Sequence, residues 1–552
     1  MARAKKKKKK KTRPAKKKVS KKTTKRAAVK TPRKQGLTAE ALARKQREIS
    51  ISEFFTKNRH LLGFDNPRKA LLTAIKEAVD NSLDACEDAG TPPDISVEIQ
   101  VVKKDERFRI VVEDNGPGIV KAQVPKIFGQ LLYGSKFHTL KQSRGQQGIG
   151  ISAAGMYGLL TTGKPVLITS RTGPRKQAMQ FRVSIDTTKN RPEVSRAEEV
   201  EWDRKHGTRV EIELEGRYQR GRQSVDEYLK QTSIANPHVD IRYLPPVGEA
   251  MHFQRVTKEL PEEPQEIKPH PYGVELGLLI KMLKDTKART LGSFLKQDFS
   301  RVGPRVAEEI CDKAGLGYKS RPSRIARSEA DNLIRAIRDV KIMAPSASCI
   351  VPIGEDLLLK RLKNDIPAAA FYTACTRTPS VYRGNPFQVE VGLAYGGDLP
   401  ADDLARVLRF ANRVPLLYQP GACLITRTLV GTDWKNYNLH KARGALPTGP
   451  LVVMVHLASV WVPFTSESKE AIADYPEIQK EIRLAVQECG RRLRIYVNRR
   501  RREADAEKKR SYIEKYIPHI GDALQEILGL SDRGRTTTVN QLNVILEKSR
   551  KM

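Results

Sequence analysis

The sequence predicts an α+β protein in which a helix-and-sheet domain, a small helical domain and a second domain of strands and helices follow one another. Three observations support this prediction. The chain has 552 residues, enough for about three or four domains. Apolar residues alternate as in strands before about Leu260, recur at helical spacing beyond Pro271, and return to mixed patterns beyond Ala344. The first 34 residues stand apart, because 19 of them are Lys or Arg and none is acidic.

The overall composition excludes several classes of protein. Apolar residues make up 39% of the chain and its mean hydropathy is −0.51, which is typical of a soluble globular protein with polar additions. No run of about 18 apolar residues is present, so no membrane span is predicted. The charged N-terminus lacks the apolar segment of a secretory signal. The six cysteines are scattered singly, which predicts neither zinc site nor disulfides and indicates a reducing compartment.

The basic N-terminal tail, residues 1–36, is predicted to be disordered, because it has almost no large apolar side chain with which to form a core. It supplies 19 of the 38 net positive charges. An arm of this kind binds phosphate backbones without reading sequence, and salt weakens its hold. We therefore expect double-stranded DNA as a partner, with a nuclear-localisation run or a solubilising tail as the alternatives.

A helix predicted over residues 71–88 carries the first candidate site. One stripe of this helix is apolar and would fix it to a core; it consists of Leu72, Ile75, Val79, Leu83 and Cys86. The opposite face carries Glu77, Asn81 and Asp84, each about one turn from the next. A magnesium–nucleotide site needs a carboxylate that polarises water and an oxygen ligand for a hard cation. The helix alone fits a solvated polar face equally well.

Two glycine-rich turns follow. A strand predicted over residues 108–112 ends in Asp114-Asn115-Gly116-Pro117-Gly118, where Asp114 could accept a hydrogen bond from an exocyclic amine. An ordinary hairpin turn is the alternative. The second turn, from Arg144 to Met156, opens a small-residue helix whose free N–H groups would attract an anion. It is not a Walker loop, since no Gly-Lys-Ser/Thr follows.

In this order and spacing, the three stretches resemble the Bergerat ATP-binding fold of the GHKL superfamily. That superfamily includes type II topoisomerases, heat-shock-90-type chaperones, MutL-type repair proteins and histidine kinases. Two further stretches, Ile51 to Asp65 and Val462 to Glu470, are similar to the B-subunit family of type VI DNA topoisomerases. The resemblance extends from about Ile49 to Arg500. It implies the ATP-binding and ATP-hydrolysing subunit of a type II topoisomerase.

The resemblance divides the chain into five parts. These are the basic tail (1–36), a GHKL ATPase domain with an α/β sandwich (37–260), a helix-two-turns-helix domain (261–343), a ribosomal-protein-like transducer domain (344–500) and a C-terminal helical segment (501–552). In the third part, helices are predicted over 274–284, 290–297, 304–314 and 328–340 around one apolar core. Basic residues around that core permit DNA contact, while a packing insert with a basic face is the alternative.

The resemblance also implies roles for individual residues. Glu77 and Lys469 would be catalytic, Glu77 as general base and Lys469 as a cation that reaches the γ-phosphate from the transducer domain. Asn81 would bind Mg²⁺, and Asp114 would accept from the adenine amine. The other implied nucleotide-binding residues are Asp84, Gly116, Gly118, Lys136, Gly145, Gln146, Gln147, Gly148, Ile149, Gly150 and Thr208. For Lys136, in the polar loop that would form the ATP lid (134–143), and for Lys469, a solvated lysine is the alternative.

ATP and Mg²⁺ are therefore the expected ligands. ATP would close two copies of the chain into a gate that traps a DNA duplex. A separate A subunit would cleave the DNA within an A₂B₂ enzyme, held by a basic helix predicted over residues 485–516. Residues 37–51 would strap across the partner protomer or form a simple linker. We expect no membrane partner, and a location in the cytoplasm at the nucleoid, or in the nucleus of a eukaryote.

Three other functions stay open at this point. A MutL-type repair ATPase also clamps DNA, but it lacks the helical insert. A histidine kinase needs a helix with a phospho-acceptor histidine, and none of the nine histidines is placed in one. A non-enzymatic nucleoid protein with a vestigial ATP fold would fit the basic tail, but the presence of Glu77, Asn81 and Lys469 argues against decay.

Periodicity predicts the remaining elements. In the ATPase domain, a helix is expected over 120–133 and strands over 166–170, 178–185 and 208–213. In the transducer domain, strands are expected over 388–395, 422–428 and 451–462, and helices over 401–413 and 476–497.

Overall fold

The computed structural model describes residues 43, 49–104, 106–134, 136, 139–145, 148–187 and 189–548. The chain forms two compact units, residues 1–49 and 50–552, and every element described below belongs to the second. The predicted basic tail and most of the predicted strap, residues 37–51, lie outside the described residues.

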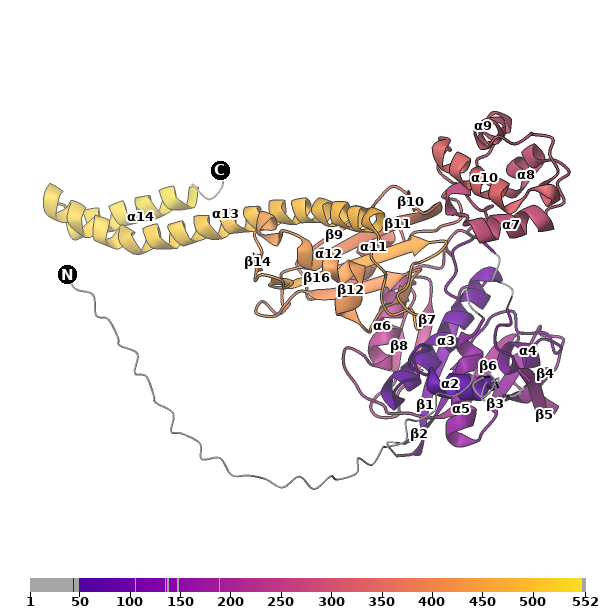
Figure 1. Ribbon diagram of the computed structural model, residues 1–552. Coiled ribbons are helices and arrows are strands. Elements are labelled where there is room, and N and C mark those ends of the chain that lie inside the picture. Colours follow the sequence, from indigo (N-terminus) through magenta and orange to yellow (C-terminus); the bar gives the residue numbers. More distant parts are fainter. Residues whose placement is uncertain are drawn as a thin grey trace, which may run out of the picture. The chain divides into compact units, whose positions relative to one another are not determined.

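A mixed sheet of eight strands forms the first layer of this unit (Figure 1). Its strand order is β5-β4-β3-β6-β2-β1-β7-β8, and every neighbouring pair is antiparallel except β1 and β7. The bounds are β1 (Asp94–Lys103), β2 (Arg107–Glu113), β3 (Val166–Arg171), β4 (Ala178–Asp186), β5 (Arg191–Val200), β6 (Gly207–Glu215), β7 (Asp240–Leu244) and β8 (Met251–Phe253). Buried residues alternate along β1 and β6, which is typical of a sheet with one covered face.

Helices cover that face of the sheet. They are α2 (Ile51–Lys57), α3 (Pro67–Asp88), α4 (Val124–Gly129), α5 (Gly150–Thr162) and α6 (Val225–Ala235). Helix α3 begins at Pro67 because the Asn66 side chain accepts a hydrogen bond from the Lys69 backbone N–H at 2.9 Å. The predicted apolar stripe of α3 is buried along its length. It packs into the core beneath the sheet and so fixes which way the opposite face of the helix points.

Four helices form a separate apolar core: α7 (Leu276–Asp285), α8 (Leu291–Asp298), α9 (Pro304–Ala314) and α10 (Arg327–Asp339). They confirm the four helices predicted for this stretch. Leu295 and Ile310 are fully buried, and Phe294 meets Phe299 edge-on with ring centroids 5.4 Å apart.

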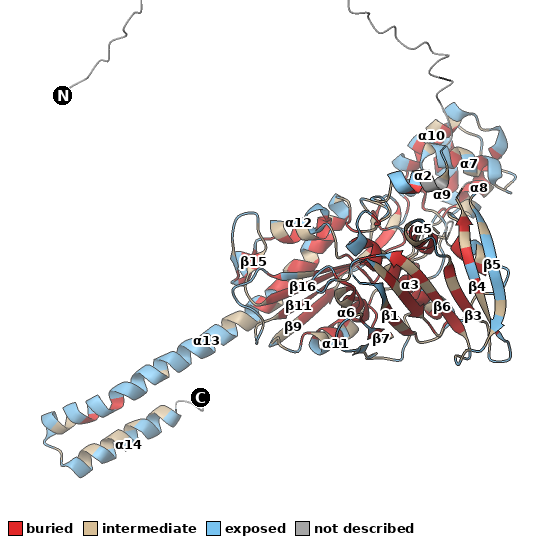
Figure 2. Cartoon of the chain, turned by 90° about the horizontal axis from the view of Figure 1, so that it is seen from below, coloured by how far each residue is buried: buried red, intermediate tan, exposed pale blue. Residues whose placement is uncertain are grey.

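A second sheet has six strands: β9 (Phe371–Thr376), β10 (Ser380–Tyr382), β11 (Asn385–Tyr395), β12 (Arg406–Ala411), β13 (Val414–Pro415) and β16 (Leu451–Ser459). A small ladder, β14 (His440–Lys441) with β15 (Pro447–Thr448), lies beside it. Every residue of β16 is buried, because helices cover both faces of this sheet (Figure 2). On one face lie α12 (Leu424–Gly431) and the start of α13 (Pro476–Leu528), and on the other lies α11 (Glu355–Asp365). Ile234 and Ala235 of α6 join the α11 side, so α6 packs against both the first sheet and the second.

Two predictions for this second sheet are wrong. Residues 401–413, predicted as a helix, contain β12, and residues 422–428, predicted as a strand, contain the start of α12. β12 pairs in parallel with the buried strand β16, so main-chain bonds to a distant segment replace local helical ones. In α12 the Thr428 hydroxyl donates to the Leu424 carbonyl at 2.8 Å, and the apolar residues at helical spacing are buried.

A third prediction is wrong in extent. The helix expected over residues 120–133 is limited to α4, which ends at Gly129. A Cβ at Gly129 would lie 2.6 Å from the Pro192 Cβ of β5, so the helix end packs closely on the sheet edge. Leu132 then adopts a left-handed conformation with φ 60°, which cannot continue a helix.

The chain ends in a long helical arm. Helix α13 has 53 residues; its first turns pack on the second sheet and its later turns are mostly exposed. Helix α14 (Asp532–Lys548) runs back along it (Figure 1). Within the part of the chain that the structure describes, no helix is both long enough and apolar enough to cross a bilayer.

Candidate nucleotide-binding site

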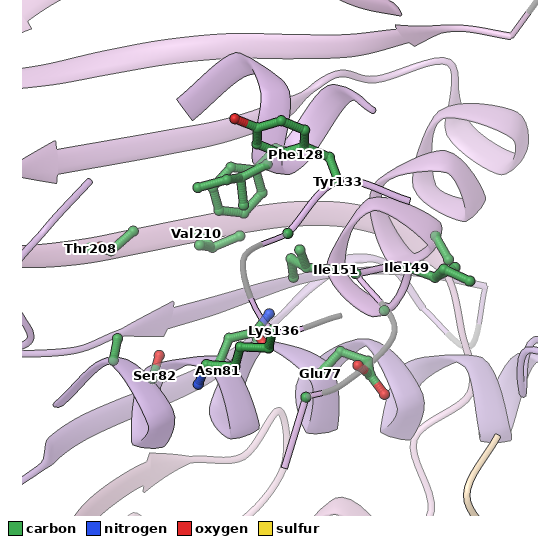
Figure 3. A pocket seen from close by; sticks show the side chains of 18 of the residues that line it. Glu77, Asn81, Ser82, Phe128, Tyr133, Lys136, Ile149, Ile151, Thr208 and Val210 are labelled. Atoms are coloured by element: carbon green, nitrogen blue, oxygen red, sulfur yellow. The ribbon is translucent and has the colours of Figure 1, made fainter. Parts of the chain in front are cut away.

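A cavity of about 630 Å³ lies between α3, the start of α5 and the first sheet (Figure 3). Most of the predicted site residues line it: Glu77, Asn81, Asp114, Gly118, Lys136, Gly145, Gly148, Ile149, Gly150, Thr208 and Lys469. Asp84 and Gly116 do not, although each bonds a residue that does. Gln146 and Gln147 lie outside the described residues.

Helix α3 directs two polar side chains into the cavity. Glu77 and Asn81 lie one turn apart on the face opposite the buried stripe, and both point toward the space below the sheet (Figure 3). Gly145 passes the same helix at contact distance, since a Cβ there would lie 3.5 Å from Asn81 Oδ1. The Asn81 carbonyl oxygen and the Glu77 carboxylate are thus held at the wall where the glycine-rich turn passes.

Asp114 is anchored at the end of the cavity nearest the sheet. Its Oδ1 accepts hydrogen bonds from the backbone N–H groups of Gly116 at 2.9 Å and Thr208 at 3.0 Å. Its Oδ2 accepts from the Ser82 hydroxyl at 2.9 Å. Burial raises the pKa of Asp114, and these three donors only partly oppose it. A carboxyl oxygen held in this way keeps a free lone pair for a further donor.

Three glycines allow the backbone to close around the cavity. A Cβ at Gly150 would overlap the Glu77 carboxylate, so any other residue there would push the Glu77 side chain aside. Gly118 has φ 71°, and a Cβ there would overlap the Arg171 carbonyl oxygen. Gly207 has φ 141°, and a Cβ added there would overlap the Asp114 carbonyl oxygen. The alternative of an ordinary hairpin at Asp-Asn-Gly fails, because β2 pairs with β1 and β6 and its end turns into the cavity.

Arg144 joins the glycine-rich turn to α3 through a buried ion network. Its guanidinium donates to Asp84 at 2.9 Å and to both Glu87 oxygens at 2.7 Å. Lys136 approaches the other Asp84 oxygen at 2.9 Å. Burial alone would raise the pKa of Asp84, but the charges of Lys136 and Arg144 outweigh it and lower that pKa. Asp84 therefore serves the cavity through Arg144 and Lys136.

Lys469 reaches the cavity from the loop that follows β16. Its Nζ donates to the Arg144 carbonyl oxygen at 2.8 Å, at the opening of the glycine-rich turn. The neighbouring Glu470 is buried and pairs with Lys69 of α3 at 2.5 Å. Burial alone would lower the pKa of Lys69, but hydrogen bonds to Glu470 and Asp65 outweigh it and raise that pKa. This buried pair holds the Lys469 loop against the helix that carries Glu77.

Sequence reasoning misses several residues of the site. Ser82 follows Asn81 directly, and its bond to Asp114 depends on a pairing between α3 and β2 that no local pattern reveals. The sequence marks Arg144 only as the start of a turn, although it is the centre of the ion network. The apolar walls also escape prediction, and they include Phe64, Ile119, Phe128, Ile151 and Val210. Their signal in the sequence is indistinguishable from that of ordinary core residues.

The first domain is an α/β layer with a nucleotide-sized cavity between helix α3 and the sheet, and the glycine-rich start of α5 borders this cavity. This arrangement places the chain among the GHKL ATPases. Residues 66–217 match the family of histidine kinase-, DNA gyrase B- and HSP90-like ATPases. Residues 345–509 match the transducer of the topoisomerase VI B subunit.

Curated relatives give the same result. The B subunit of type 2 DNA topoisomerase 6 from Methanococcoides burtonii is 51% identical over 491 residues, covering 89% of this chain and 79% of the relative. Its counterpart from Archaeoglobus fulgidus is 49% identical over 485 residues, covering 88% and 80%. The chain belongs to the family of type 2 DNA topoisomerase 6 B subunits, which confirms the predicted family, fold class and ATP-driven type II topoisomerase function. The kinase, MutL-type and non-enzymatic alternatives are set aside.

Proposed function

We propose that the cavity below the first sheet binds ATP, and that its hydrolysis drives a gate made of two copies of this chain. The observation that supports this most directly is the convergence of Glu77 and Asn81 of α3 with Lys469 of a distant loop on one cavity. A cation carried by a second domain can sense whether the terminal phosphate is present.

Glu77 is the proposed general base. Its carboxylate lies against the N-terminus of α5, where free N–H groups favour the phosphates of a nucleotide. Glu77 would orient the attacking water and take its proton, while Lys469 and the N–H groups of the glycine-rich turn stabilise charge on the terminal phosphate.

Mg²⁺ fits this donor set. Among the described residues, no group of three or more His, Cys, Asp or Glu side chains forms a metal cage. Mg²⁺ is commonly held by one or two protein oxygens together with substrate phosphates, and the Asn81 carbonyl oxygen beside Gly145 offers one such ligand. When bound, the ion would neutralise charge on the phosphates.

Asp114 is the proposed adenine acceptor. Backbone N–H groups and Ser82 already fix its carboxyl, so its remaining lone pair is oriented before the ligand arrives. Thr208 lines the cavity beside it and would contribute to the same edge of the base through water.

The remaining features extend the proposal to the whole enzyme. We assign an ATPase domain to residues 37–260, a helix-two-turns-helix domain to 261–343, a transducer domain to 344–500 and a helical segment to 501–552, after the basic tail of 1–36. ATP would dimerise two chains around a DNA duplex, and a separate A subunit would cleave DNA in an A₂B₂ assembly. The basic tail and the helical domain are the proposed DNA contacts, and the exposed part of α13 is the proposed A-subunit contact.

The experiment that tests the catalytic assignment compares wild type with Glu77→Gln. We expect hydrolysis to fall by about 10²- to 10⁴-fold while a non-hydrolysable ATP analogue still binds, because the change removes a base without emptying the cavity. Equal hydrolysis rates would exclude Glu77 as the base. Cross-linking with the analogue, and recovery of a DNA-cleaving partner in equal amount, test the dimer and the A₂B₂ assembly separately.

A further inference from the structure

A second cavity, of about 570 Å³, lies where α6 and the loop before it meet β12 and the start of α12. It shares no lining residue with the nucleotide cavity. Its wall contains five arginines: Arg68, Arg220, Arg222, Arg406 and Arg409. The lining holds a single acidic residue, Glu227, so the wall is strongly positive.

Glu227 neutralises only one of these five charges. Its Oε1 pairs with Arg406 and also accepts a hydrogen bond from Gln231 at 2.6 Å. Arg220 donates to the Val247 carbonyl at 2.7 Å, which is a neutral acceptor. Four arginine charges in the wall therefore lack a carboxylate within the lining. Arg68, Arg220, Arg222 and Arg406 are exposed, so solvent screens their mutual repulsion, and an anion between them would gain chiefly from hydrogen bonds donated by the guanidinium groups.

Two residues that line this cavity, Arg409 and Thr426, each have a buried donor atom without a hydrogen-bond partner among the described residues. Arg409 is 4% exposed, and its Nη2 donates to the carbonyls of Leu416 at 2.7 Å and Tyr418 at 2.8 Å. Its Nη1 is buried and finds no hydrogen-bond acceptor among the described residues. The Thr426 Oγ1 is likewise buried without a partner in that part of the chain. Unmet buried donors are costly, so two of them in one cavity wall indicate a ligand that accepts hydrogen bonds.

We propose that this cavity binds a small phosphate-bearing anion, distinct from the ATP of the first cavity. Guanidinium groups match phosphate oxygens in a two-pronged geometry, and Arg409 and Thr426 would supply the innermost donors. The volume lies in the range of small-ligand sites. A DNA duplex is too wide to enter, and its phosphates could meet only the arginines at the rim.

The ligand would bridge two parts of the chain. Arg220, Arg222 and Glu227 come from the first sheet's domain, whereas Arg406 and Arg409 come from β12 of the second sheet. An anion bound to both sets favours the arrangement in which the two parts are close. Arg68 connects the two cavities along the chain. It lines the second cavity and precedes Lys69, whose partner Glu470 follows Lys469 of the nucleotide cavity.

The test uses calorimetric titration of the full chain with inorganic pyrophosphate. The nucleotide cavity is first saturated with a non-hydrolysable ATP analogue, which is titrated on its own so that failure to bind nucleotide is seen separately. Thr426→Val keeps the side-chain shape and removes the unpartnered hydroxyl. We expect it to weaken pyrophosphate binding about tenfold, because a hydrogen bond to a charged group is lost.

Arg222→Gln is the second variant, since Arg222 is exposed and its loss leaves the fold intact. We expect it to weaken pyrophosphate about threefold, as for an exposed charge pair. Arg494→Gln, an exposed arginine on α13, is the matched control and should bind as wild type. The basic tail is identical in all four proteins.

Equal pyrophosphate affinity in all four proteins would mean that only the tail or surface binds the anion, and would overturn the proposal. Binding of a short DNA duplex that is weakened by Thr426→Val, without a matching effect on pyrophosphate, would overturn the small-anion assignment. Weaker pyrophosphate binding in Thr426→Val and Arg222→Gln, with Arg494→Gln unchanged, would support it.

Discussion

Replacing Glu470 with glutamine tests whether the buried pair with Lys69 holds Lys469 at the cavity. The Nζ of Lys69 lies 2.5 Å from a Glu470 oxygen and 2.9 Å from Asp65, and the Lys69 and Glu470 side chains are 9% and 6% exposed. Breaking a buried pair by removing one partner costs about 3–5 kcal/mol. Lys69 keeps Asp65, whose side chain is 37% exposed and so compensates it only in part. We therefore expect Glu470→Gln to destabilise the fold by about 2–3 kcal/mol.

The assay combines thermal melting with ATP hydrolysis at saturating ATP. Melting should begin about 5–10 °C lower, if the affected cooperative unit has about 150–250 residues. Hydrolysis should fall about tenfold, because a loosened loop must lose about 1.4 kcal/mol of conformational freedom to bring Lys469 back. Asp331→Asn is the control; it breaks an exposed pair with Arg335 in α10 and should change stability by less than about 0.5 kcal/mol.

A double variant decides whether the effect belongs to the pair. Combining Lys69→Met with Glu470→Gln removes both charges, so the double variant should be about 2 kcal/mol more stable than the sum of the two single losses predicts. If the two single losses add to within about 0.5 kcal/mol, Lys69 and Glu470 are not coupled, and their pair does not hold the Lys469 loop.

Three further predictions follow from single residues. Asp80 is buried, and burial raises its pKa from 3.8 to about 6. Because the native state then binds a proton that the unfolded state has released, the free energy of unfolding falls as pH rises from about 4 to 6. In denaturant titrations, Asp80→Asn should be about 2–3 kcal/mol more stable than wild type at pH 7.5 and equal to it at pH 4. Gly150→Ala should reduce hydrolysis by at least about tenfold while melting changes little, since the added methyl displaces Glu77; an unchanged rate would contradict the close approach. Asp114→Asn should weaken binding of an ATP analogue by about tenfold or more, and unchanged binding of the analogue would contradict its role at the base.

Much of the first domain is predictable because its signals are local. The stripe on α3 is evident from five residues at helical spacing, and its burial then determines that Glu77 and Asn81 face the cavity. The glycines at 118 and 150 stand out in the sequence, and the structure gives the reason, which is the lack of room for a Cβ. Lys469 is assigned by resemblance alone, since a loop lysine carries no distinguishing pattern.

Sequence motifs and periodicity alone suffice to infer the family, the helix that carries Glu77 and Asn81, and the helical insert, because these signals act within a few residues. Tertiary structure decided what depends on distant partners. It made β12 a strand, because pairing with β16 outweighs local preference, and it made α12 a helix whose apolar residues are buried against the second sheet. It paired Asp84 with Arg144 and Lys136, and it brought Glu470 to Lys69, since charges buried together must be paired and only the folded chain fixes which ones meet.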